Sequence, residues 1–300
     1  MHKPVYRKIF FASLIILAGL PCLSQLPDFS RVPNLHPGDT AAIARLVYNG
    51  VKIRRGAIIA WFPKDSLPAR QMNRIVDTLN IGVKAAEKII GNHAWQVHRA
   101  GEPYTFYFRS DSFVSHASGA GFVSIPFWRI REGKAPWLHE AAHELLAAKK
   151  GNWQNPSVSR EEWVKNMPLW LYEGTAEYIS IVASQRRNLP HFDVQINTWF
   201  RDIDSLCKQD LQNEKADYIL SFVGKKGGMP ELFGKDRRLY APAFYHLSCS
   251  FVKYLAEQAG LQLLITSLSA YPDEQAVLEK SLPLPIDELK RSWLAKIRNL

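Results

Sequence analysis

The chain has 300 residues, of which 47% are hydrophobic and 22% charged, with nine tryptophans and fifteen phenylalanines. This length and composition are those of a folded protein with a substantial core, and they exclude a disordered chain. The net charge is +10, but the Lys and Arg residues are scattered and no nucleic-acid-binding motif occurs, so we expect no nucleic-acid partner. The positive charge favours solubility and attraction to acidic surfaces such as those of a cell envelope.

Residues 1–24 have the organisation of a signal peptide. Three basic residues precede a twelve-residue apolar run, 9–20, which is too short to span a bilayer, and Pro21 follows it. Small residues favour cleavage after Ser24, which would lower the net charge from +10 to +7. We therefore expect an exported, periplasmic or extracellular protein without stable membrane insertion after cleavage. An uncleaved membrane anchor is the alternative; a lipid attachment at Cys22 is disfavoured because no small residue directly precedes it.

Two cysteines, Cys207 and Cys249, remain in the mature chain. In an exported protein they could form one disulfide or stay as two buried thiols, and the sequence leaves both open. Neither lies beside a histidine that could activate it as a nucleophile.

The hydrophobic patterns divide the mature chain into three parts. Residues 25–55, which begin with prolines and polar residues, are expected to be an irregular lead-in. Residues 56–150 are expected to form an α/β subdomain, and 151–300 a helical subdomain. The expected strands are 56–63, 94–100, 104–111 and 119–130, the last at a sheet edge because it contains Pro126. The expected helices are 68–91, 136–150, 166–187, 240–260 and 285–300.

The helix expected at 136–150 carries His139, Glu140 and His143 in the pattern H-E-x-x-H. Residues four positions apart share a helix face, so both imidazoles can ligate one ion. Glu140 is one residue round the helix and can reach a water at that ion without binding the metal itself. A catalytic zinc takes three protein ligands, so the pattern predicts a third one elsewhere in the chain.

The stretch LWLYEGTAEY (169–178) offers Glu173 as that third ligand. Gly174 follows, and because glycine in a helix costs about 1 kcal/mol relative to alanine, we expect close approach of this helix to the metal-binding helix. Glu177, one turn after Glu173, is placed to accept a hydrogen bond from a ligating histidine. The alternative for both glutamates is a solvated helix face, which the H-E-x-x-H pattern disfavours.

With these two motifs, roughly residues 56–300 resemble the gluzincin zinc metallopeptidases, in particular the bacterial peptidase MA-like group. The resemblance implies an α+β, zincin-like fold, with an N-terminal mixed-sheet subdomain, a mainly helical C-terminal subdomain and an active-site cleft between them. It also implies one Zn²⁺ per chain, bound by His139, His143 and Glu173, with Glu140 as the base that assists a zinc-bound water in peptide hydrolysis.

The resemblance further implies an edge strand that pairs with an extended peptide or protein substrate. Here that segment is formed by Gly119, Ala120, Gly121 and Phe122. It lacks the acidic residue with which aminopeptidases hold a free amine, and this favours an endopeptidase.

Related enzymes stabilise the oxyanion with a Tyr or His from a later helix. We expect Tyr245 in this role, with His246 and Tyr240 as alternatives and simple packing as the competing explanation for a tyrosine there. Glu144 is expected at the surface or in helix pairing. His116 is expected in a loop near the cleft.

Two other functions stay open from the sequence. The chain could be a catalytically silent protein of gluzincin fold that binds peptides or cell-surface polymers. It could also use the same zinc chemistry on another amide, such as one in a cell wall.

Overall fold

The computed structural model describes residue 29 and residues 38–91, 104–111, 114–147, 165–187, 202–270 and 273–300. The strands are β1 (Val51–Arg55), β2 (Ile58–Phe62), β3 (Tyr104–Arg109), β4 (His116–Ala117) and β5 (Phe122–Pro126). The helices of the first half are α1 (Asp39–Asn49), α2 (Ala69–Ile90), α3 (Phe127–Arg131) and α4 (Trp137–Ala147). Those of the second half are α6 (Leu169–Arg187), α7 (Ile203–Asp210), α8 (Ala216–Leu220), the 3₁₀ helix Pro230–Phe233, α9 (Arg237–Ala259), α10 (Leu261–Leu268), α11 (Glu274–Ser281) and α12 (Ile286–Arg298).

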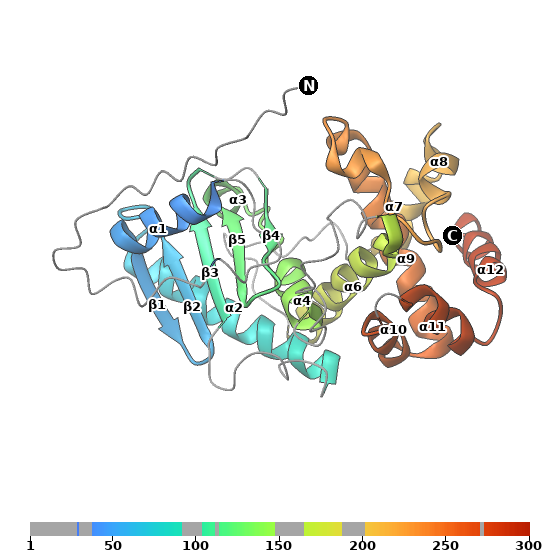
Figure 1. The fold of residues 1–300 in the computed structure, drawn as a ribbon, viewed down its shortest axis with the longest axis horizontal. Coiled ribbons are helices and arrows are strands. Elements are labelled where there is room, and N and C mark those ends of the chain that lie inside the picture. The colour runs from blue at the N-terminus through green and yellow to red at the C-terminus, as the bar shows by residue number, and fades with distance from the viewer. Residues whose placement is uncertain are drawn as a thin grey trace, which may run out of the picture.

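The fold is α+β, as the sequence predicts, with the sheet at one end of the molecule and the later helices at the other (Figure 1). The signal peptide and the strand expected at 94–100 lie outside the described residues. None of the helices in the described part of the chain combines the length and apolar character that a membrane span requires.

The sheet is mixed, with the strand order β1-β2-β3-β5-β4. The β2–β3 and β3–β5 pairs are parallel, and the two outer pairs are antiparallel. Alternate residues of β2 face opposite sides: Ile58 and Phe62 join the main core with α2, whereas Trp61 packs in a smaller core with Ile43 of α1. Both faces of the sheet are therefore covered, which explains why its central strands are nearly continuous runs of apolar residues.

The expectation of an irregular lead-in over 25–55 is wrong for residues 39–55, which form α1 and β1. Helix α1 is held to the sheet by a buried ion pair in which the Arg109 guanidinium donates to the Asp39 carboxylate. His116 also lies on β4 and not in a loop near a cleft, with its Nε2 atom 3.0 Å from Asp39 Oδ2. These contacts link residues about 70 positions apart, so no local sequence pattern predicts α1.

The strand expected over 119–130 is shorter and is not the sheet edge. Strand β5 ends at Pro126, after which the chain turns into α3. The two-residue strand β4 lies beyond β5 and forms the edge of the described sheet. Pro126 is tolerated because it is the last strand residue, where its missing N–H breaks no continuing ladder.

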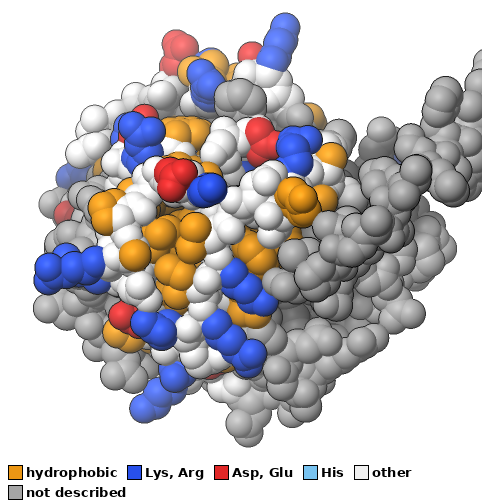
Figure 2. Space-filling model, turned by 90° about the vertical axis from the view of Figure 1, so that its left-hand side faces the viewer, with side chains coloured by type: hydrophobic (Ala, Val, Ile, Leu, Met, Phe, Trp, Pro, Cys, Tyr) orange, Lys and Arg blue, Asp and Glu red, His pale blue; other side chains and the backbone are white. Residues whose placement is uncertain are grey.

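At the opposite edge, β1 carries Lys52, Arg54 and Arg55, all exposed. Figure 2 views the molecule from this side and shows basic side chains around a group of hydrophobic ones. Lysine and arginine at an exposed edge oppose pairing with a further strand, which protects this end from aggregation.

Helix α4 connects the two halves of the molecule, because it packs against α2, β5 and α6. Trp137, Leu138, Ala141 and Leu145 are buried in the main core and orient this helix. Helix α6 packs in turn along α9, which forms the centre of the helical half (Figure 1).

Cys207 and Cys249 are both buried free thiols. Burial raises the pKa of the Cys207 thiol to about 12. Of the two alternatives that the sequence leaves open, the structure contains the pair of thiols, in their unreactive protonated form.

Gly174 lies where α6 crosses α9, not where it approaches α4 as we expected. A Cβ atom at this position would lie 2.6 Å from the backbone oxygen of Ser248 and 2.8 Å from Val252 Cγ2. We expect Gly174→Ala to lower the free energy of unfolding by about 1–2 kcal/mol, because overpacking outweighs the gain in helix propensity. Urea titration followed by circular dichroism measures this change.

The matched control is Gly234→Ala, because a Cβ atom there meets nothing within 4 Å. It should leave the unfolding midpoint nearly unchanged. A Gly174→Ala protein at least as stable as wild type would show that α6 and α9 are not in close contact.

Candidate metal centre

Three ligand atoms converge between α4 and α6. His139 Nε2 and His143 Nε2 are 3.0 Å apart, and Glu173 Oε2 lies 3.2 Å from the first and 3.1 Å from the second. Ligands about 2.0–2.1 Å from a tetrahedral metal are about 3.3 Å from one another. The triangle is therefore close to the size that one such ion requires, and it is the one group of this kind in the described part of the chain.

Glu177 contacts His139 at the ring nitrogen that is not part of the triangle. Its Oε2 atom is 2.7 Å from His139 Nδ1, and the residue is only 3% exposed. A proton on Nδ1 leaves the lone pair of Nε2 directed at the triangle, which is the form of histidine that binds a metal.

The charges of the group are strongly coupled. Burial lowers the pKa of His139, but the carboxylates of Glu177 and Glu173 outweigh it and raise this pKa well above its ordinary value. Burial raises the pKa of Glu173, but the neighbouring imidazoles of His143 and His139 hold it well below the usual range. The group is thus an ionised carboxylate and two imidazoles that attract a cation or a proton.

Glu140 and Tyr245 border this group. Glu140 is 8% exposed and lies between the two histidines on α4. The ring of Tyr245, on α9, is 6.0 Å from the ring of His139. Burial, with Glu173 adding to it, raises the pKa of Tyr245, so this phenol keeps its proton and can donate a hydrogen bond.

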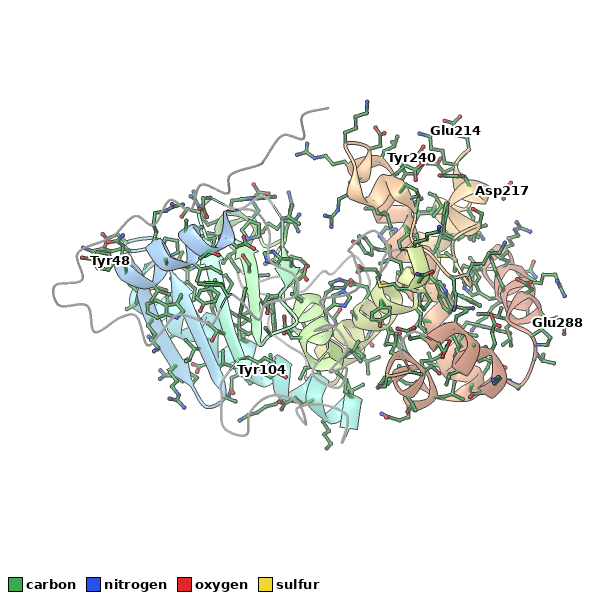
Figure 3. The ribbon with its side chains drawn as sticks, viewed as in Figure 1. Tyr48, Tyr104, Glu214, Asp217, Tyr240 and Glu288 are labelled. Carbon is green, nitrogen blue, oxygen red and sulfur yellow. The ribbon has the colours of Figure 1, made fainter. Side chains whose placement is uncertain are left out.

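The two alternatives to Tyr245 lie elsewhere. His246 points to α7, with its Nδ1 atom 2.6 Å from Asp210 Oδ2. Tyr240 packs its ring 6.0 Å from the ring of Tyr218, and Figure 3 shows it at the same end of the molecule as Asp217. The fold therefore brings only Tyr245 of these three to the metal-ligand group.

Glu144 is not at the surface, which corrects the expectation for this residue. It is 1% exposed and accepts hydrogen bonds from Ser118 Oγ at 2.9 Å, Gly119 N at 2.6 Å and Gly121 N at 2.9 Å. Burial raises the pKa of Glu144 to about 7, against the lowering effect of these donors. Glu144 thus ties α4 to the turn before β5, and its place in the apolar stretch AAHELL was the signal for burial.

The backbone amides of residues 119–122, the segment expected to bind substrate, already have hydrogen-bond partners within the protein. The remaining two amides of this segment, those of Ala120 and Phe122, donate to Ser118 Oγ at 3.0 and 3.1 Å. Both glycines have positive φ, 72° for Gly119 and 95° for Gly121, so residues 119–121 form a turn and Phe122 begins β5. The four N–H groups of the segment are used inside the protein and are not available to a peptide.

Two arginines that the sequence analysis did not single out lie at the border of the group. Arg237 Nη2 is 3.5 Å from the hydroxyl oxygen of Tyr245. Burial lowers the pKa of Arg129, Glu140 opposes this effect, and Arg237 adds to it. These couplings place both guanidinium groups within electrostatic range of Glu140, although α3 and α9 are far apart in sequence.

The geometry thus defines a candidate metal centre of two histidines and one glutamate on two packed helices. The chain matches none of the models of known protein families, and it has no significant similarity to a curated protein. Any function must therefore be argued from the site itself.

We expect Glu177→Gln to weaken zinc binding by about 10–100-fold, because the uncharged amide orients and polarises His139 less well. Competition with a chelator of known zinc affinity measures the change. The matched control is Glu132→Gln, an exposed glutamate paired with Lys134, which should bind zinc like wild type. An unchanged zinc affinity of Glu177→Gln would show that this carboxylate does not contribute to metal binding.

Proposed function

We propose that this protein is an exported zinc-dependent endopeptidase of the gluzincin type. The observation that carries the proposal is the triangle of His139 Nε2, His143 Nε2 and Glu173 Oε2, with edges of 3.0–3.2 Å. Two imidazole nitrogens and one carboxylate oxygen are a donor set that suits zinc and leaves a coordination position for catalysis.

A bound zinc ion would supply Lewis acidity, which makes water more acidic and polarises a carbonyl group. Residues of the chain would supply proton transfer and stabilisation of the oxyanion. Glu140 would accept the proton of the attacking water and return it to the leaving amine. Tyr245 would donate a hydrogen bond to the developing oxyanion, and Arg237, which donates to its hydroxyl oxygen, would hold it in place.

The substrate proposed for this chemistry is a peptide bond in an extended chain that lies between the sheet half and the helical half. The missing acidic residue for a free amine supports internal cleavage. Since the amides of 119–122 are already bonded within the protein, such a chain would have to be held by other groups.

Metal analysis of the purified full-length protein after equilibration with zinc tests the proposal. We expect about one zinc per chain in wild type and in Glu140→Ala, and none in His143→Ala, because only the last loses a ligand. Circular dichroism shows that each variant is folded. A wild-type protein without tightly bound zinc would rule out the proposed centre.

A further inference from the structure

The border of the metal-ligand group carries a positive charge that the described residues do not neutralise. Neither Arg129 nor Arg237 has a carboxylate oxygen within ion-pair distance in the described part of the chain, whereas the buried Arg109 pairs with Asp39 and Asp111. The Nε atom of Arg129 is buried and has no hydrogen-bond acceptor among the described residues. A buried guanidinium donor without an acceptor is unfavourable unless a ligand supplies the missing hydrogen-bond acceptor.

The two arginines approach from opposite halves of the molecule. Arg129 lies on α3, directly after the sheet strand β5, and Arg237 is the first residue of α9 in the helical half. A chain of contacts joins Arg237 to the centre, because its Nη2 atom is 3.5 Å from the Tyr245 hydroxyl and the Tyr245 ring is 6.0 Å from that of His139. Arg129 is coupled electrostatically to Glu140, Arg237 and Tyr245. A substrate at the proposed centre would therefore lie near Arg237 and within electrostatic range of Arg129.

We propose that Arg129 and Arg237 bind a carboxylate of the substrate beside the bond that is cleaved. The planar guanidinium group matches a carboxylate in shape and charge and binds it through two parallel hydrogen bonds. Glu140 is within electrostatic range of both arginines, but its single negative charge can offset only one of the two guanidinium charges, and a divalent cation would add further positive charge. The inference rests on the proposed peptidase function and assigns its substrate class.

The carboxylate can come from two sources in a peptide. One is the side chain of Asp or Glu near the cleaved bond, and the other is the free carboxyl terminus of a short peptide. Both present the same chemical group, so the experiment must separate them.

Calorimetric titration of the metal-free full-length protein with three peptides makes this separation without any cleavage. The first is acetyl-Ala-Ala-Glu-Ala-Ala-amide, the second has Gln for Glu, and the third is the Gln peptide with a free carboxyl terminus. We expect one of the two carboxylate peptides to bind at least about tenfold more tightly than the neutral one. The identity of the tighter peptide names the source.

Arg129→Gln and Arg237→Gln should each remove most of this preference, and Arg237→Lys should keep only part of it, because an ammonium group lacks the planar fork. The matched controls are Arg131→Gln and Arg238→Gln, exposed neighbours on the same helices, which should keep the full preference. Equal affinity for the three peptides, including no detectable binding, overturns the inference, and so does a preference that survives both glutamine substitutions.

A separate cleavage assay on the zinc-loaded protein keeps this result apart from the proposed function. Cleavage without a carboxylate preference would refute the substrate class and leave the peptidase standing. Carboxylate binding that depends on the arginines, without any cleavage of a peptide library, would refute the peptidase and leave the binding site standing.

Discussion

Glu140→Gln is expected to lower kcat/KM for a peptide substrate by about 10²–10⁴-fold, the range that a general base contributes. The amide is nearly isosteric but cannot accept a proton from water. Because Glu140 is not among the atoms of the ligand triangle, zinc content and the unfolding midpoint should stay close to wild type. A peptide-library digest resolved by mass spectrometry, followed by kinetics on the best peptide, measures the effect.

Glu132→Gln serves as the control, since this exposed glutamate pairs with Lys134 and lies outside the centre. Its activity should match wild type. Cleavage by Glu140→Gln at a rate near that of wild type, with zinc still bound, would contradict the assigned base. Binding of peptides without cleavage by any variant, including wild type, would favour the silent peptide-binding protein instead.

Asp39→Asn is expected to lower the free energy of unfolding by about 3 kcal/mol or more, the size of effect seen when one partner of a buried ion pair is removed. Asp39 and Arg109 are 2% and 6% exposed. The substitution removes the buried negative charge, and the amide oxygen that replaces it is a weaker acceptor for the guanidinium. The remaining partners of Arg109 are Ser124 Oγ at 3.3 Å and the more exposed Asp111 at 3.1 Å. A loss of this size is a large part of the stability of an ordinary domain. Urea unfolding measures it.

The neighbouring pair of Arg45 and Asp111 provides the control. Its side chains are 66% and 44% exposed, with 3.0 Å between Arg45 Nη2 and Asp111 Oδ2. Arg45→Gln should therefore change the free energy of unfolding by less than about 1 kcal/mol. Equal effects of Arg45→Gln and Asp39→Asn would mean that the link between α1 and the sheet is not buried in solution.

Local spacing in the sequence was sufficient to predict which side chains share a face wherever those side chains belong to one helix. His139 and His143 share a face because they are four residues apart, and Glu173 and Glu177 share one for the same reason. The long amphipathic helices α2 and α12 also lie within two residues of the predicted bounds, because their apolar periodicity alone specifies the buried side.

Sequence reasoning was wrong where a contact between distant segments decides the structure. Helix α1 depends on Asp39 meeting Arg109, and the turn before β5 depends on Glu144 accepting its amides. The reason for Gly174 lies on α9 and not on α4. In each case the partner is 23 or more positions away, and no periodicity relates two such residues.

The sequence by itself determined the types of ligand and their pairing within each helix, because a helix repeats every 3.6 residues whatever surrounds it. Only the tertiary structure decided that the two pairs meet, that Tyr245 and not Tyr240 or His246 lies beside them, and that Arg237 donates to the hydroxyl oxygen of Tyr245. Those placements follow from how α4, α6 and α9 pack, and packing is set by many side chains acting together over the whole core.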